Sequence, residues 1–202
     1  MVDLAERSRK SEDDYFRRRE QELVEKLRKK AEAEAHRKGL AEAIGLENEQ
    51  ILDLLREMGF DRATVVVLFL VPLLQVAWSD GSITEGEKGL ILEAAHAHGV
   101  KEGTPAHEKL NGWLAARPSE ETFDRAMLII RDLMGFQSAE ARRETTGRLL
   151  DTCQRIAAAS GGFLGLGSKI SAEEAAVMKR VASEIERAHA DAAKRVLGAM
   201  KA

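Results

Sequence analysis

Two acidic residues follow the most apolar run of the sequence at a spacing typical of cation ligands. Asp80 and Glu87 stand in the stretch SDGSITEGE, residues 79–87. With the glycine and isoleucine between them, they match the second half of a calcium loop, in which glycine makes the bend and glutamate closes the site from the next helix. The two leading acids of such a loop would fall at Val76 and Trp78, which do not coordinate a hard cation. A complete calcium loop is therefore disfavoured.

The same residues have a structural interpretation. Thr84 and Glu87 form the T-x-x-E pattern of a capping box, in which hydroxyl and carboxylate each bond a backbone N–H of the first helical turn. Asp80 followed by glycine is a common turn pair. We expect these capping and turn roles whether or not a metal binds, so the cation hypothesis stays open beside them.

A related pattern occurs a second time, near the end of the sequence. An apolar helix, a glycine-containing turn and an S-x-x-E box ending at Glu174 repeat the first arrangement. The second copy carries six extra residues, 163–168, and has Gly161 where the first has Asp80. The repeat predicts two related helix-turn-helix units. A weak divalent-cation site shared between them would use Asp80, Glu87 and Glu174.

From Thr64 to Glu186 this arrangement resembles the TerB family, which is associated with tellurite resistance. The motif that carries the resemblance is A-x-x-D-G-x-I-x-x-x-E after an apolar helix, followed by a degenerate copy. The resemblance implies an all-helical bundle of two pseudo-symmetric halves. It also implies a divalent metal (Ca²⁺, Mg²⁺ or Zn²⁺) held by acids near the turns, and a stress-response role tied to a membrane partner. Asp80 and Glu87 match the first copy of the motif, and Glu174 matches the second.

The composition is that of a helix-rich globular protein. The chain has 202 residues, of which 44% are hydrophobic and 32% charged, with only three prolines. Its formal net charge of -3 gives no positive field for a nucleic acid. The single cysteine, Cys153, excludes an intrachain disulfide and fits a reducing compartment. Because the N-terminus also lacks the apolar core of a secretory signal, we expect a cytoplasmic all-α protein without a nucleic-acid partner.

The N-terminal part of the chain predicts a long amphipathic helix. Residues 12–38 are densely charged, and Phe16, Leu23 and Leu27 fall mostly on one face. This narrow apolar stripe must dock on its own domain, on another helix, or on a membrane surface. We therefore interpret residues 1–60 as a helical arm and expect a protein partner or self-association through it.

The apolar run that precedes the acidic turn has two interpretations. The unbroken segment, residues 63–74, is shorter than the roughly 20 residues that a membrane span needs. It also contains Pro72 and is followed by Gln75. We predict a central buried helix kinked at the proline.

The glycine-rich stretch at residues 162–169 has serine and lysine transposed relative to a P-loop and no preceding strand, which disfavours nucleotide binding. Phe163 and Leu164 in this stretch either fold back onto the core or contact a membrane or partner groove. The histidines show no metal-ligand spacing, and Cys153 lies on an apolar helix face, so no catalytic set is recognisable.

Together these features predict a TerB-like domain at residues 61–202 with an N-terminal arm, acting as a non-enzymatic binding or scaffold module in a stress or signalling system. The alternative is a helical adaptor that uses the arm and holds no metal.

Overall fold

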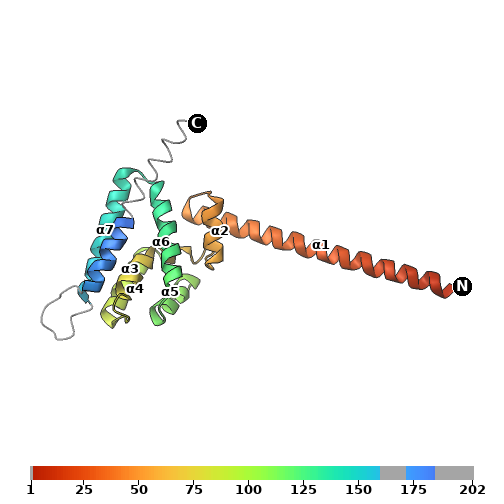
Figure 1. Cartoon of the computed structure of the whole chain (residues 1–202), viewed down its shortest axis with the longest axis horizontal. Coiled ribbons are helices and arrows are strands. Elements are labelled where there is room, and N and C mark those ends of the chain that lie inside the picture. Colours follow the sequence, from red (N-terminus) through yellow and green to blue (C-terminus); the bar gives the residue numbers. More distant parts are fainter. Residues whose placement is uncertain (1, 160–171, 185–202) are drawn as a thin grey trace.

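The computed structural model describes residues 2–159 and 172–184, with side chains described from residue 16 onward. All the regular structure in these ranges is helical (Figure 1). The elements are α1 (Val2–Ile44), α2 (Glu49–Glu57), the 3-10 helix η1 (Val65–Leu70), α3 (Val71–Ala77), α4 (Glu85–Ala97), α5 (Pro105–Ala115), α6 (Glu120–Gly135) and α7 (Ala139–Ala159). Residues 172–184 are also helical. The prediction of an all-α fold is confirmed.

Local sequence signals account for most of the helix starts. Asn48, Thr84, Thr104 and Ser119 are the N-caps of α2, α4, α5 and α6, and the side chain of each accepts a hydrogen bond from the backbone N–H three residues later. Such bonds satisfy one of the four N–H groups that a helix start leaves without an intrahelical partner. Because each capping bond joins residues only three positions apart, these helix starts can be predicted from local sequence.

The short helix α3 lies at the centre of the molecule. All of its residues are buried, and it packs against α4, α6 and α7 (Figure 1). Its leucines and valines belong to one hydrophobic core that also includes Ile91 of α4, Ile129 of α6 and Ile156 of α7. The apolar run after residue 63 is therefore the core of the fold, as its composition predicts. No helix in the described ranges is both long enough and apolar enough to cross a membrane.

The predicted single helix with a kink at Pro72 is wrong in detail. The run forms two elements, the 3-10 helix η1 and then α3, with Pro72 in the first turn of α3. Proline has no N–H to donate, and its fixed φ suits the first turn of a helix, so a new helix starts at the proline. The tighter 3-10 geometry upstream is a common way to enter an α-helix.

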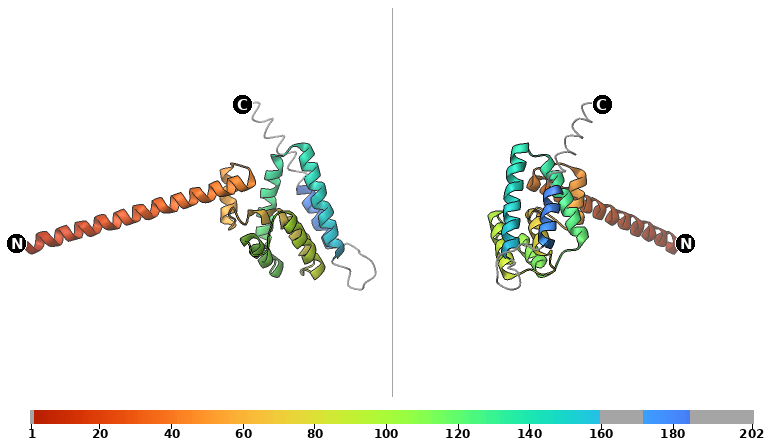
Figure 2. Two further views of the ribbon diagram at one scale, coloured as in Figure 1. Left: turned by 180° about the vertical axis from the view of Figure 1, so that it is seen from behind. Right: turned by 60° about the vertical axis from the view of Figure 1, so that its left-hand side comes forward.

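Among the residues that the structure describes, α1 joins the core near its C-terminal end. Leu40 is fully buried in the core with Leu55 of α2 and Phe60. Toward the N-terminus α1 projects away from the other helices as one continuous element (Figure 1, Figure 2). It is longer than the predicted helix at residues 12–38. The division of the chain into domains at residue 60 stays a prediction.

Candidate functional site

The capping box predicted at the start of α4 is present. The Glu87 N–H donates to Thr84 Oγ1 at 3.3 Å, and Glu87 Oε2 accepts from the backbone N–H and the hydroxyl of Thr84, both at 2.7 Å. These bonds use one oxygen of the Glu87 carboxylate and fix the side chain against the helix terminus. The turn role predicted for Asp80 is present as well, since its Oδ1 accepts from the Ser82 N–H at 3.0 Å.

The other carboxylate oxygen of Glu87 has no such bond. Glu87 is only 1% exposed, and its Oε1 is buried without a hydrogen-bond partner in the described part of the chain. Burial raises the pKa of Glu87, while the two bonds from Thr84 lower it, and the negative charges of Asp80 and Glu174 raise it further. A buried acceptor without a partner is costly unless a proton, a water or a cation meets it.

Glu174 is the second buried acid of this region. It lies in the helical segment 172–184, is 2% exposed, and is close enough to act electrostatically on Glu87. Asp80 acts on Glu87 in the same sense from its exposed turn. Two of the three predicted ligands, Asp80 and Glu174, therefore act electrostatically on the third, Glu87. Among residues 2–159 and 172–184, however, no group of three or more acids, histidines or cysteines has the geometry to hold a metal ion.

The start of α4, which carries Glu87, lies close to the end of α7. A Cβ atom built on Gly86, next to Glu87, would lie 3.3 Å from the carbonyl oxygen of Ala159 at the end of α7. The absence of a side chain at position 86 lets the start of α4 meet the end of α7. The sequence gives no signal for this contact, because the two residues are far apart in the chain.

The predicted contact residues of the arm are exposed on α1. Relative exposures are 67% for Phe16, 57% for Leu23 and 57% for Leu27, and Val24 on the same side is 59% exposed. The other two predicted contact residues, Phe163 and Leu164, lie outside the described residues, as does the hydroxyl expected to cap the helix of Glu174.

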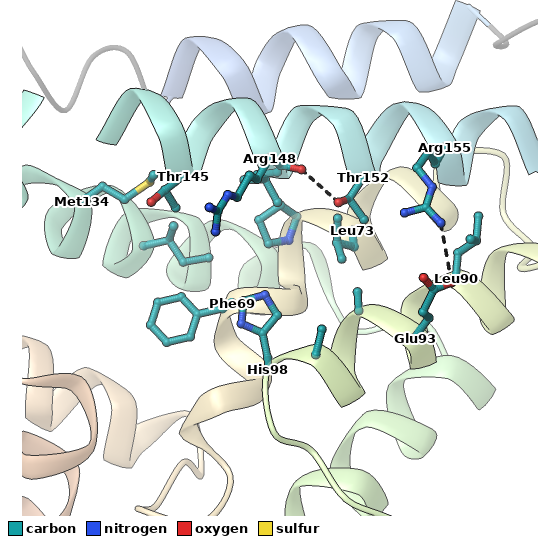
Figure 3. A pocket seen from close by; sticks show the side chains of 15 residues that line it. Phe69, Leu73, Leu90, Glu93, His98, Met134, Thr145, Arg148, Thr152 and Arg155 are labelled. Atoms are coloured by element: carbon teal, nitrogen blue, oxygen red, sulfur yellow. Dashed lines mark hydrogen bonds and ion pairs between the residues drawn. The ribbon is translucent and has the colours of Figure 1, made fainter. Parts of the chain in front are cut away.

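Sequence reasoning missed an apolar groove between α4 and α7, called the α4–α7 groove below. Its volume is about 480 Å³, its floor comes from η1 and α3, and the end of α6 closes one side. Figure 3 shows Arg148, Thr152 and Arg155 of α7 facing Phe69, His98 and Glu93 across it. Arg155 and Glu93 form an ion pair of 3.6 Å between the two walls. A surface assembled from so many elements leaves no local pattern.

Comparisons with protein-family models, with curated proteins and with solved structures found no match to this chain. Its function must therefore be argued from these residues.

Proposed function

We propose that the chain is a non-enzymatic, TerB-like binding module whose buried acids take up a divalent cation weakly. The observation that carries the proposal is the buried Oε1 of Glu87, which has no hydrogen-bond partner among the described residues and whose pKa is raised by the charge of a second buried carboxylate, Glu174. Two buried negative charges repel each other, and a bound cation would offset this repulsion. The cation would also give the buried Oε1 of Glu87 a partner. The pseudo-symmetric pairing of two repeats is part of this proposal, because one acid comes from each.

The donor atoms have the chemistry of a hard-cation site, but in the described residues the three carboxylates do not converge into a metal-binding group, so only a weakly held ion is proposed. Carboxylate oxygens are the ligands of Ca²⁺ and Mg²⁺. Glu87 offers one oxygen, since the other is occupied by Thr84. Asp80, on an exposed turn, and Glu174 would complete the protein's share, with water in the remaining positions. So few protein ligands favour Mg²⁺ or weakly held Ca²⁺ over a tight calcium site, and Zn²⁺ is the third ion to test.

The test is thermal unfolding of the full chain with and without millimolar Ca²⁺, Mg²⁺ or Zn²⁺. A ligand present at 100 times its dissociation constant adds about 2.7 kcal/mol to the free energy of unfolding. We expect Asp80→Asn and Glu174→Gln to reduce the shift. Glu85→Gln is the matched control, because Glu85 lies on the same helix with its side chain 92% exposed. No shift in the natural chain, or the same shift in all variants, would refute cation binding.

The exposed stripe on α1 favours a second function, that of an adaptor that needs no metal. An isolated helix in water gains little stability from propensity alone, and most helical stability in proteins comes from packing an apolar face. Leu23, Val24 and Leu27 are more than half exposed on a helix that projects from the body. We propose that this stripe is a protein contact surface, in a cytoplasmic stress or signalling system. The link to tellurite resistance and a membrane partner rests on the resemblance alone.

The adaptor function is tested with two serine variants on opposite faces of α1. Leu27→Ser alters the stripe, while Lys29→Ser, two residues on, alters the other side of the same helix. Association with a protein partner, or with further copies of the chain, is expected to weaken in Leu27→Ser and to persist in Lys29→Ser. If both variants associate as the natural chain does, the stripe is not the contact surface.

A further inference from the structure

The α4–α7 groove is an apolar surface that the proposed cation site does not use. Its lining includes Leu90 and Ala94 from α4, Leu149 from α7 and Leu73 from α3. Phe69 from η1, also in the lining, is 38% exposed, which is high for an aromatic side chain beside the core. The apolar lining is small, and Phe69 is its most exposed large apolar side chain. An open groove walled by helices suits an amphipathic helix.

The chain itself carries an amphipathic helix with an exposed face. Phe16, Leu23 and Leu27 of α1 follow the spacing i, i+7 and i+11, which places them on one side of the helix. This stripe does not reach the groove of its own chain. Helix α1 is continuous to Ile44 and leads away from α4 and α7 in every view (Figure 1, Figure 2). A groove that meets this stripe must belong to another molecule.

The two surfaces have matching lengths. At 1.5 Å per residue, the stripe from Phe16 to Leu27 extends about 16 Å. The wall that α7 contributes to the groove runs from Thr145 to Arg155, which is about 15 Å on the same basis. The stripe and the α7 wall are therefore about equally long, and a helix docked along the whole wall would have to displace the Arg155–Glu93 ion pair that joins the two walls at one end.

One charged residue on each surface has the sign to form an ion pair with the other. Glu20 falls on the same face of α1 as the stripe, between Phe16 and Leu23. Arg148 lies among the apolar residues of the groove, where Figure 3 shows it on the α7 wall. Arg148 pairs with Glu144 one turn earlier, with both side chains largely exposed. An exposed ion pair within one helix is weak, so Arg148 can exchange it for an acid brought in by a docking helix.

We propose that the α1 stripe of one molecule docks in the α4–α7 groove of a second copy of the chain, with Glu20 of the first molecule pairing with Arg148 of the second. This inference rests on the proposed role of the stripe as a contact surface, and it names the partner. Reciprocal docking gives a closed dimer, and one-way docking gives a longer head-to-tail assembly. Both place position 20 of one molecule beside position 148 of another.

The experiment is disulfide trapping between two differently substituted full-length chains. Glu20→Cys and Arg148→Cys chains are mixed in equal amounts under mild oxidation, and the mixed dimer is identified by mass spectrometry. Both positions are exposed, so the variants are expected to fold. The natural Cys153 is buried and stays in place. The natural chain alone shows whether it contributes any cross-link.

Matched controls place the cysteine on the opposite faces of the same two helices. Arg18→Cys lies two residues from Glu20 on the other side of α1, and Gln154→Cys is exposed on α7 outside the groove. We expect the Glu20→Cys and Arg148→Cys mixture to cross-link roughly tenfold faster than either mixture that contains a control, because docking raises the effective concentration of the paired thiols.

Two results would overturn the inference, and they differ in what they leave standing. If Glu20→Cys chains cross-link only with each other, arms pair with arms; the groove is then not the acceptor, although the stripe remains a contact surface. If no mixture exceeds its controls and sedimentation shows a monomer across the concentrations used, self-docking is excluded. The serine variants of Leu27 and Lys29 then decide separately whether the stripe contacts a different protein.

Discussion

The close approach of α4 to α7 makes a sharp prediction about three glycines. Gly86, Gly89 and Gly147 all lie inside helices, so replacement by alanine lowers the conformational entropy cost of folding at each position. For Gly89 and Gly147 nothing lies within 4 Å of the added Cβ. At these two positions we expect the free energy of unfolding to rise by up to about 1 kcal/mol.

At Gly86, the second residue of α4, the gain is no larger than at Gly89 and meets a steric cost. The new Cβ would lie 3.3 Å from the Ala159 carbonyl oxygen and 3.7 Å from the Ala159 Cβ, so the end of α7 must move by a few tenths of an ångström. Overpacking of this kind typically costs about 1–3 kcal/mol. Because the required shift is small, we take the lower part of this range and expect Gly86→Ala to be less stable than Gly89→Ala by about 1–2 kcal/mol.

Urea unfolding followed by far-ultraviolet circular dichroism measures this difference. For a chain of this length, it corresponds to a midpoint difference of about 2–8 °C in thermal unfolding. The comparison within one helix removes effects that any alanine in α4 would have. If Gly86→Ala and Gly89→Ala agree within about 0.3 kcal/mol, the usual error of such comparisons, α4 and α7 do not meet as closely as the structure shows.

Three further predictions concern acids and the two ends of the molecule. The Thr64 hydroxyl, together with the backbone N–H groups that bond the same carboxylate, holds the pKa of Asp61 below its ordinary value. The stabilisation that ionised Asp61 gives is therefore present above the unfolded-state pKa of 3.8 and is lost as the pH falls through the lower folded-state pKa. When the free energy of unfolding is measured against pH, Asp61→Asn should lose less of it on acidification than the natural chain does. Leu55→Ala should lower the free energy of unfolding by about 2–5 kcal/mol because Leu55 is fully buried. Leu27→Ser should change the free energy of unfolding of the monomer by less than about 0.5 kcal/mol because Leu27 is exposed. Similar losses in both variants would mean that the arm packs on its own chain. Glu87→Gln should raise the melting temperature at neutral pH without metal, because glutamine also completes a capping box but carries no buried charge. The same variant should abolish the rise in melting temperature that a divalent cation causes. A lower melting temperature without metal would contradict the cost assigned to the buried charge.

The features predicted from sequence are those that depend on a few neighbouring residues. The capping box of Thr84 and Glu87 spans one helical turn, so its residues specify it completely. The buried character of the run after residue 63 follows from composition. The exposed stripe on α1 follows from helical periodicity, although the helix extends further than predicted at both ends.

The features that sequence reasoning did not give depend on distant segments. The α4–α7 groove combines side chains from η1, α3, α4, α6 and α7, and no periodicity in any one of them marks a cavity. The division of the apolar run into η1 and α3 near Pro72 depends on how the core packs around the residues of η1. Glu174 acts electrostatically on Glu87, but both the pairing of two repeats and a metal site shared between them stay predictions.

Because α1 is one continuous helix from the stripe to the core, the direction in which the stripe faces is fixed relative to the core, and so is the orientation of any partner bound to it. Leu27 and Leu40 are joined by helix alone, about 20 Å long at 1.5 Å per residue, with 100° of rotation at each step. Inserting two residues between them would turn the stripe to nearly the opposite side, whereas inserting seven would nearly restore its direction and only lengthen the spacer. The arm thus transmits orientation as well as distance, and the spacing of Leu27 and Leu40 in the sequence sets both.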